Sequence, residues 1–356
     1  MNSRISIGLV GCGAAGKIQA QAMKESEYVD LRCVVDCEPR AAQSLGDRVG
    51  VTWTTEIDRL LDDPTVEVVS LAVPHHLHLE LASRVARAGK HILLEKPFTL
   101  NTAQARQLVD LCRAQHVTVV PWLERRYLPY VDRIRELVAL GTLGKLAYTR
   151  VSALGYKPRA YWEYGMRFEE YPSSWRGRKA ESGGGILIMN GIHQVDLMTY
   201  LTGLEVTEVF AQVATLHHEV EVEDLALVSL RYRGGAMGVV EASCCTYGVN
   251  QFPIEAPPDA IMGTDGYLQL GAPLKCYDRI RFSRQFDFPK LSVTDMKIRQ
   301  LENVARHLRE GAELRCSAED VIRALAVIEA AYESAACRAP VSPCCAAAAG
   351  DSGSAE

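Results

Sequence analysis

The sequence lacks several features that would assign it to a special class of protein. None of its 11 cysteines belongs to a Cys-x-x-Cys pair, so neither a disulfide framework nor a zinc site has the spacing it needs. Its hydrophobic runs are too short to cross a membrane. The formal net charge is -5, and there is no Lys/Arg-rich run of the kind that binds nucleic acid. We therefore expect no nucleic-acid partner and no membrane partner.

The start of the chain also lacks a targeting signal. It runs from Met1 into an apolar segment without the charged leader, apolar stretch and small-residue cleavage site of a secretory peptide. We therefore expect a cytoplasmic protein. The 356 residues, 48% of them hydrophobic, suffice for two domains that each have a core.

The segment 5–16, ISIGLVGCGAAG, is an apolar run that ends in three glycines. Gly-x-Gly-x-x-Gly between a strand and a helix is typical of the phosphate-binding turn of a dinucleotide-binding βαβ unit. Gly11 permits the tight turn, Gly13 admits the pyrophosphate, and Gly16 lets the helix pack on the strand. The N–H groups at the start of the helix, expected to bind the pyrophosphate, belong to Ala14 and Ala15.

The next apolar run, 31–35, ends at Asp36, about twenty residues past the glycine turn. An acidic side chain at this place accepts hydrogen bonds from the adenosine ribose and repels a 2′-phosphate, so NAD is favoured over NADP. Cys37 follows and brings no cation that would offset the repulsion. Arg40 is the alternative, because its guanidinium could reach a 2′-phosphate from the first turn of the next helix.

The pattern of apolar residues changes once along the chain. In the first part, short apolar runs alternate with amphipathic segments, which predicts a parallel sheet with helices on both faces. The second part has longer segments of period two, which predicts an α+β domain with a largely antiparallel open sheet. We thus expect a Rossmann dinucleotide-binding domain over 1–121, a domain for substrate binding and oligomerisation over 122–338, and a disordered tail over 339–356.

Two segments of the second part, 226–232 and 237–244, carry apolar residues on more than one face. Exposed apolar sheet surface tends to be covered by a partner. We therefore expect a homodimer or homotetramer.

Glu95, Lys96 and Pro97 directly follow the predicted strand 91–94. The carboxyl ends of strands in an open parallel sheet border the nucleotide crevice, so Lys96 is predicted to lie where nicotinamide and substrate meet. A surface lysine paired with Glu95 is the alternative.

Several motifs occur in the order in which the Gfo/Idh/MocA oxidoreductases carry them, and the chain resembles this family of glucose-fructose oxidoreductase and myo-inositol dehydrogenase as far as Arg338. The matching motifs are the glycine turn, Pro74-His75-His76-Leu77-His78, Glu95-Lys96-Pro97, Arg125-Arg126-Tyr127, Gly183-Gly184-Gly185 followed by Gly191-Ile192-His193 with Asp196, and Gly263-Thr264-Asp265-Gly266.

The resemblance implies an NAD(P)-dependent transfer of a hydride between nicotinamide and a secondary hydroxyl or ketone of a sugar, amino sugar or cyclitol. It also implies that Lys96 lies in the active site and that His193 exchanges the proton, a role that suits an imidazole with an ordinary pKa of about 6.5. As a cation, Lys96 would stabilise the developing alkoxide. The alternatives are an NAD-dependent glycoside hydrolase and a non-catalytic nucleotide-sensing homologue.

The sequence departs from the family pattern at Met189, where many members carry an acidic residue one helical turn before the histidine. Asn190, on the same face, can hydrogen-bond a hydroxyl but cannot accept its proton. Asp196 could orient His193 or raise its pKa instead. A helix-surface pair of these two residues is the alternative. The residues expected to carry the chemistry are Lys96, His193, Asn190 and Asp196.

The run Pro74-His75-His76-Leu77-His78 invites a metal interpretation. Adjacent residues on a strand-to-helix turn point apart, and no carboxylate or cysteine nearby completes a ligand set, so we expect no metal. His78, which matches the family pattern, is expected to line the cofactor crevice. The further residues expected to contact the cofactor are Cys37, Arg40, Ala72, Pro74, His75, His78, Glu95, Lys96 and Arg125.

The segment 156–175 interleaves aromatic and basic residues. Aromatic faces with polar neighbours suit a sugar ring, whose C–H face is apolar and whose edge is polar. A buried loop that anchors the second domain is the alternative. The residues expected to contact a small polyol substrate are Lys96, Tyr156, Trp162, Trp175, Arg176, Asn190 and His193.

Overall fold

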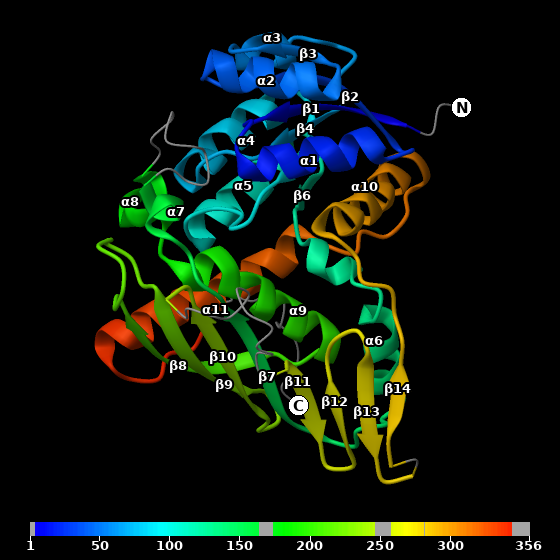
Figure 1. Cartoon of the computed structure of the whole chain (residues 1–356), viewed down its shortest axis with the longest axis vertical. Coiled ribbons are helices and arrows are strands. Elements are labelled where there is room, and N and C mark those ends of the chain that lie inside the picture. Colours follow the sequence, from blue (N-terminus) through cyan, green and yellow to red (C-terminus); the bar gives the residue numbers. More distant parts are fainter. Residues whose placement is uncertain (1–3, 164–173, 246–257, 281, 344–356) are drawn as a thin grey trace, which may run out of the picture.

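The computed structural model describes residues 4–163, 174–245, 258–280 and 282–343, which form two units built on separate sheets (Figure 1). The first sheet is parallel, with strand order β3-β2-β1-β4-β5-β6. Its strands are β1 (Ile5–Val10), β2 (Val29–Val35), β3 (Thr52–Thr54), β4 (Val68–Leu71), β5 (His91–Leu94) and β6 (Val119–Pro121). This is the predicted Rossmann topology, in which a ligand crevice lies at the carboxyl ends of the strands.

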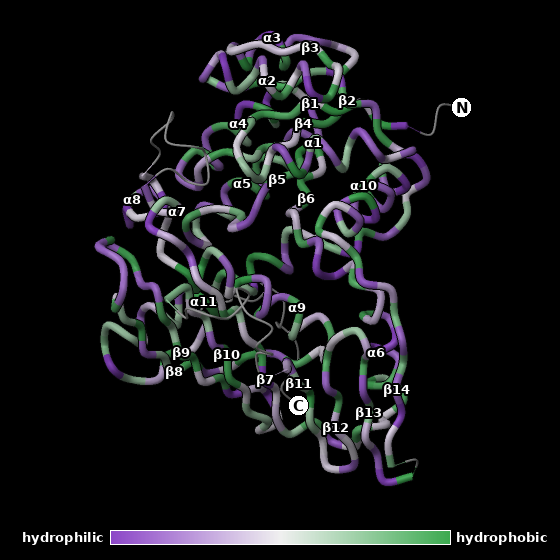
Figure 2. Tube along the Cα trace, in the orientation of Figure 1, coloured by the Kyte–Doolittle hydropathy of each residue, from purple (hydrophilic) through white to green (hydrophobic). Residues whose placement is uncertain are grey.

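Helices connect these strands on both faces of the sheet. They are α1 (Ala14–Glu25), α2 (Pro39–Val49), α3 (Ile57–Leu61), α4 (His78–Arg87) and α5 (Thr102–Ala114), with the short 3₁₀ turn η1 (His75–Leu77) before α4. Because both faces are covered, the central strands are apolar runs, and Ile5, Ile7 and Leu9 of β1 have no exposed surface. Figure 2 shows this apolar centre as green tube along β1 and β4.

The second sheet is mixed and largely antiparallel, in the order β14-β13-β12-β11-β7-β10-β9-β8. Its strands are β7 (Leu146–Leu154), β8 (Val206–Ala214), β9 (Leu225–Tyr232), β10 (Met237–Ser243), β11 (Ala260–Gly263), β12 (Gly266–Gln269), β13 (Leu274–Asp278) and β14 (Arg284–Phe286). One pair, β7 with β10, is parallel. The predicted combination of a Rossmann sheet and a largely antiparallel open sheet is confirmed.

One face of the second sheet is covered by helices that follow or precede it in the chain. The helices and turns of this unit are η2 (Glu124–Tyr127), α6 (Val131–Ala139), α7 (Arg159–Glu163), η3 (Ser174–Gly177), α8 (Lys179–Ser182), the π-helical turn η4 (Leu187–Gly191), α9 (Ile192–Thr202) and α11 (Ala318–Cys337). α11 packs against β8 and α9. None of the described helices is long and apolar enough to cross a membrane.

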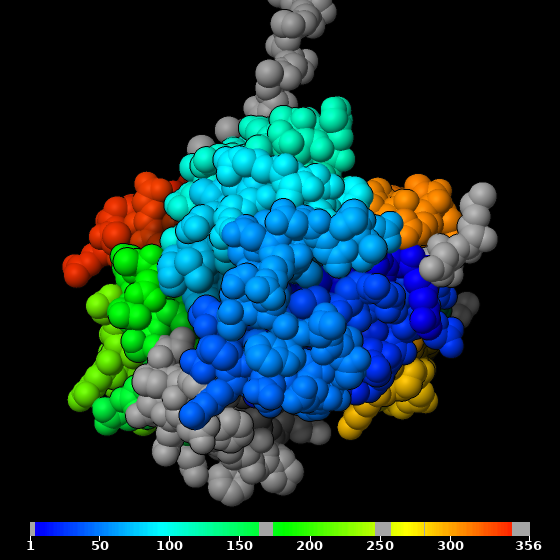
Figure 3. Space-filling model, turned by 90° about the horizontal axis from the view of Figure 1, so that it is seen from above, coloured from blue at the N-terminus to red at the C-terminus, as the bar shows by residue number. Residues whose placement is uncertain are grey.

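The chain returns to the first unit near its end. α10 (Val293–Glu310) lies against α1, as Figures 1 and 3 show from two sides. A capping box between Ser292 and Asp295 starts this helix, and Gly311 in a left-handed conformation ends it. α10 thereby brings residues that are remote in sequence beneath the crevice.

Two features differ from the sequence-based expectations. The helix expected to carry His193 is preceded by the π-helical turn η4, and π turns are frequent at functional sites. In the tail predicted to be disordered, Val341 pairs with Val209 through two backbone hydrogen bonds of 2.8 and 2.9 Å, so order extends past 339. The rest of that tail, 344–356, lies outside the described residues.

Candidate active site

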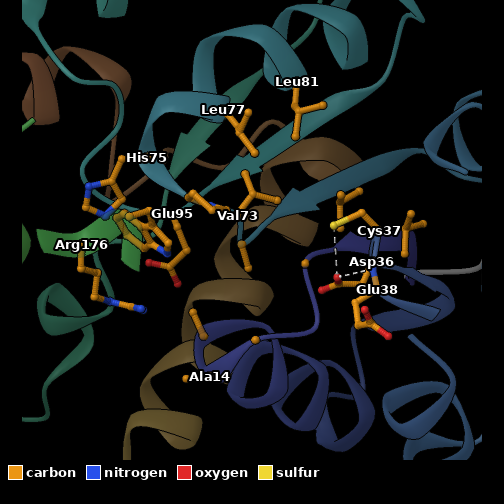
Figure 4. Close-up of a pocket in the computed structure, with 18 of the residues that line it drawn as sticks. Ala14, Asp36, Cys37, Glu38, Val73, His75, Leu77, Leu81, Glu95 and Arg176 are labelled. Atoms are coloured by element: carbon orange, nitrogen blue, oxygen red, sulfur yellow. Dashed lines mark hydrogen bonds between the residues drawn. The ribbon is translucent and has the colours of Figure 1, made fainter. Parts of the chain in front are cut away.

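A cavity of about 720 Å³ opens at the carboxyl ends of the first sheet. Residues that end or follow β1, β2, β4 and β5 line it, which is where this topology places a nucleotide. Figure 4 shows its two ends: Asp36, Cys37 and Glu38 lie together on one side, and Glu95 and Arg176 lie on the other. The cavity thus extends from a nucleotide region to a second region whose lining residues come from both units.

The glycine turn brings backbone close to backbone at one side of this cavity. Gly11 has a φ of +99°, and a Cβ there would overlap the carbonyl oxygen of Ala72. A Cβ on Gly16 would overlap the carbonyl oxygen of Gly11, so α1 can pack on β1 only with glycine at this position. Gly13 precedes the first turn of α1, and within the described residues no side chain caps that turn. Its N–H groups, including those of Ala14 and Ala15, suit an anion.

Asp36, directly after β2, binds the glycine turn from the neighbouring strand. Its buried carboxylate accepts hydrogen bonds from the backbone N–H of Cys12 at 2.7 Å and of Glu38 at 3.0 Å. These bonds hold the glycine turn and the end of β2 in one arrangement. Cys37 also lines the cavity, whereas Arg40 is exposed and is not among the lining residues.

The donor set fits a dinucleotide. The glycine cradle that a Cβ would fill and the helix N-terminus suit a pyrophosphate, and the carboxylate of Asp36 suits a ribose diol. Ala72 and Pro74 line the cavity between these groups and the region around Lys96.

Lys96 lies at the far end of the cavity, directly after β5. Its Nζ donates a hydrogen bond of 2.5 Å to the carbonyl oxygen of Met189, in the π-helical turn η4. The side chain therefore joins the two units. Burial lowers the pKa of Lys96, against the opposing effect of the carboxylates of Glu95 and Glu124.

A buried group of charges lies beneath Lys96. Lys297 of α10 contacts Glu95 Oε1 at 3.1 Å and Glu124 Oε2 at 3.5 Å, and its Nζ lies 4.2 Å from the centre of the Trp122 ring. Gln19 donates a further bond of 2.7 Å to Glu95. Burial disfavours the charge of Lys297, but the two carboxylates outweigh it and raise its pKa. In turn, Lys297 is the main group that offsets burial and lowers the pKa of both carboxyls.

Sequence reasoning missed Glu124 and Lys297 as site residues. Glu124 directly precedes the Arg125-Arg126-Tyr127 motif, and that position is the signal that could have found it. Lys297 has no such signal, because 202 residues separate it from Glu95 and only the packing of α10 brings the two together.

His193 lies in the first turn of α9, is buried, and is not among the residues that line the cavity. Its Nε2 is 3.9 Å from Glu124 Oε1, and its Nδ1 has no hydrogen-bond partner among the described residues. Burial, Lys96 and Arg125 lower the pKa of His193 well below 6.5. The imidazole is therefore neutral at neutral pH.

The expected contact of Asp196 with His193 is wrong. Asp196 forms a two-pronged ion pair with the buried guanidinium of Arg126, at 2.9 Å to Nε and 2.5 Å to Nη2. Arg126 also bonds Asp320 at 2.9 Å and thereby ties η2 to α9 and α11. The helical period puts Asp196 on the same face of α9 as His193. The carboxylate instead binds Arg126, a bidentate partner from another element.

The three histidines of the 74–78 segment have separate surroundings. His75 lines the cavity, bonds the carbonyl oxygen of Ser182 at 2.8 Å and packs edge-on against Trp175. The expected position of His78 in the cofactor crevice is wrong, because its ring is fully buried and bonds the carbonyl oxygens of Val73 and Pro97. Within the described residues there is no group of three side chains that could hold a metal.

An aromatic wall completes the far end of the cavity. Tyr161 and Trp175 line it, and the guanidinium of Arg176 lies 4.9 Å from the ring centre of Tyr161 and 4.5 Å from that of Trp175. The hydroxyl of Tyr161 lies 3.6 Å from the sulfur of Met189. Flat apolar faces with a cation beside them can hold a ring that has polar edges. The intervening residues 164–173 lie outside the described residues.

Other predicted contact residues do not line this cavity. Trp162 is buried and packs between Tyr161 and His218, as the alternative of an anchoring loop anticipated. Tyr156 pairs with Cys245 at the end of β10. The remaining two are Arg125, which bonds Gln194 Oε1 at 2.5 Å, and Asn190, which is half-buried in η4.

Models of one protein family match both units of the chain. Residues 5–121 match the oxidoreductase family with an NAD-binding Rossmann fold, and residues 131–269 match the GFO/IDH/MocA C-terminal domain. The chain belongs to the GFO/IDH/MocA oxidoreductase family. The resemblance seen in the sequence and the predicted cofactor, NAD, are thus confirmed.

Among members of the GFO/IDH/MocA family, myo-inositol 2-dehydrogenase of Thermotoga maritima is 27% identical over 335 residues, which cover 92% of this chain and 95% of the relative. Levoglucosan dehydrogenase of Pseudarthrobacter phenanthrenivorans is 26% identical over 280 residues, 70% of each chain. A solved levoglucosan dehydrogenase with NADH and levoglucosan has the same fold, with a TM-score of 0.84 at 23% identity over 96% of this chain and 100% of that chain. GenD2 from gentamicin A biosynthesis, solved with NAD, has a TM-score of 0.79 at 26% identity over 95% and 96%.

Proposed function

We propose that this GFO/IDH/MocA oxidoreductase transfers a hydride between NAD and a secondary hydroxyl or ketone of a sugar, amino sugar or cyclitol. The observation that carries the proposal is the position of Lys96, which lines one cavity with the glycine turn, Asp36 and the aromatic wall. The names of the relatives support the substrate class, since myo-inositol and levoglucosan are both polyols.

Lys96 is proposed to act on the reacting oxygen. When bound, the nicotinamide supplies the acceptor or donor of the hydride. A lysine ammonium has three donors, so the bond from Lys96 to Met189 leaves capacity for a substrate oxygen. A hydrogen bond from this cation stabilises the negative charge that develops on the oxygen as its proton leaves.

His193 is proposed to accept the hydroxyl proton. Its lowered pKa keeps the imidazole neutral, and therefore basic, at neutral pH. Asn190 lies three residues before it in the π-helical turn and is proposed to hydrogen-bond a neighbouring hydroxyl. Tyr161, Trp175 and Arg176 would hold the ring of the substrate.

A panel of polyols, amino sugars, cyclitols and nucleotide sugars, each with NAD and with NADP, tests the function through the absorbance of the reduced nicotinamide. A dehydrogenase forms reduced cofactor in proportion to ketone product. A glycoside hydrolase of the same family would instead release free sugar without net reduction. If no member of the panel reacts, that result contradicts the proposal.

We further propose that the second sheet forms a homodimer or homotetramer interface through its uncovered face. Large apolar side chains point outward there from three neighbouring strands: Phe210 of β8, Leu227 of β9 and Met237 of β10 are 39%, 48% and 54% exposed. Large apolar side chains exposed on an uncovered sheet face tend to be covered by a second copy.

A further inference from the structure

Glu124 and His193 face each other in the buried layer beneath Lys96. They come from different elements, the 3₁₀ turn η2 and the helix α9. Both side chains are buried, and the closest approach, His193 Nε2 to Glu124 Oε1, is 3.9 Å. That distance suits an ion pair with a protonated imidazole, and catalytic hydrogen bonds are often this long before the reactants bind.

Neither side chain is fully satisfied by the rest of the protein. Glu95, the other carboxylate of the layer, accepts hydrogen bonds from Gln19 and Lys297. Glu124 has an ion pair with Lys297 at 3.5 Å, but its Oε2 has no hydrogen-bond partner within the described residues, and the same is true of Nδ1 of His193. Lys297 still pairs with that oxygen of Glu124, whereas Nδ1 of His193 has no partner within the described residues; a buried polar atom without a partner costs stability, so Nδ1 calls for an explanation.

Neither α9 nor the turn η4 before it supplies a carboxylate to His193. Met189 stands one turn before His193, where a carboxyl would reach the same face, and Asp196 is held by Arg126. The nearest carboxylate that the structure gives to the imidazole is therefore Glu124, which Lys297 holds from beneath.

We infer that Glu124 is a positioning residue that orients His193 and stabilises its imidazolium, in place of an acidic side chain at Met189. This inference rests on the proposed dehydrogenase function. In the forward direction the substrate O–H bond breaks and its proton passes to Nδ1 of His193, while Nε2–H faces Glu124. A bound NAD would supply the acceptor for the hydride from the carbinol carbon, so that loss of this proton and of the hydride together would give the ketone.

Several charges act on His193 at once. Lys96 and Glu95 lie after β5, Arg125 and Glu124 lie in η2, and Lys297 lies in α10. The three cations lower the pKa of the imidazole, and Glu95 raises it. Glu124 Oε1 lies 3.9 Å from Nε2 of His193, where a carboxylate favours the protonated imidazole, so we expect the pKa to fall when the charge of Glu124 is removed.

The test is a titration of His193 by NMR in the full-length protein with isotope-labelled histidine, assigned through His193→Asn. We expect Glu124→Gln to lower the pKa of His193 by about one unit or more, or out of the measurable range. Glu124→Asp keeps the charge, so the pKa of His193 should return most of the way to its wild-type value. This variant also replaces Glu124→Gln if that variant does not fold. Asp278→Asn is the matched control, because it removes a buried carboxylate paired with Arg284 in the second sheet and should leave His193 unchanged.

Kinetics with the best polyol of the panel gives a second readout. Glu124→Gln should move the acid limb of kcat/KM to lower pH and lower the plateau, while NADH binding stays within a few fold. An unchanged pKa of His193 in Glu124→Gln would overturn the inference. If none of the tested polyols causes the wild-type protein to reduce NAD, the proposed function fails instead. The NMR titration then still decides whether Glu124 acts on His193.

Discussion

The choice between NAD and NADP depends on one carboxylate, and its removal should change that choice measurably. Asp36 is 4% exposed and accepts the N–H groups of Cys12 and Glu38, so its charge is fixed in place beside the ribose region of the cavity. At about 4 Å, a pair of like charges repels by about 1 kcal/mol in water and about 4 kcal/mol in the effective dielectric near a protein surface. Because two N–H donors share the charge of Asp36 and the cavity is open, we take a value near the lower end.

A repulsion of about 1.4 kcal/mol corresponds to a tenfold preference. The wild-type protein should therefore use NAD with a kcat/KM at least about tenfold above that for NADP. Asp36→Asn keeps the shape but loses the charge, so it should narrow the ratio several-fold. The amide cannot accept both backbone N–H groups as the carboxylate does, so the same variant should lose about 1–3 kcal/mol of unfolding free energy.

Initial rates over a series of NAD and NADP concentrations measure the ratio, and urea unfolding measures the stability. Asp47→Asn, which removes an exposed carboxylate of α2, is the control and should change neither. Arg40→Ala should also leave the ratio unchanged, because the exposed Arg40 does not line the cavity. Equal efficiency with both cofactors in the wild type, or an unchanged ratio in Asp36→Asn, would refute the reasoning.

Four further outcomes follow from the site and its surroundings. Lys96→Met should lower kcat by about a hundredfold while NADH binding, followed by fluorescence, stays within a few fold, and near-normal turnover would remove Lys96 from the chemistry. Because burial and nearby cations lower the pKa of His193, the acid limb of kcat/KM should lie below pH 6.5, and His193→Asn should abolish it; a limb that persists would point to another base. Asp196→Asn should cost about 3 kcal/mol in urea unfolding, since it leaves the guanidinium of Arg126 without its charged bidentate partner, and a stable but inactive variant would contradict a purely structural role. Leu227→Asp should dissociate the oligomer in light scattering, and a wild-type monomer at micromolar concentration would contradict the proposed interface.

Local patterns identified the main features of the cofactor half of this protein, although His78, Arg40 and Arg125 do not line the cavity as expected. The glycine spacing, the acidic residue at the end of the second strand and Lys96 after the fifth were readable because a Rossmann unit builds its crevice from loops close in sequence to their strands. Gly11 shows why. Neighbouring loops approach so closely there that only glycine fits, and a glycine at that position can be recognised in the sequence.

The packing of distant elements determined the rest. Asp196 and His193 share a helical face in the sequence, yet Arg126 takes Asp196 because η2 packs against α9 and offers a bidentate cation. Likewise Lys297 reaches Glu95 and Glu124 only because α10 returns to lie on α1. Residue periodicity reports which side chains share one element, whereas ion pairing in a buried layer depends on contacts between elements, so the partner of His193 was visible only in the folded chain.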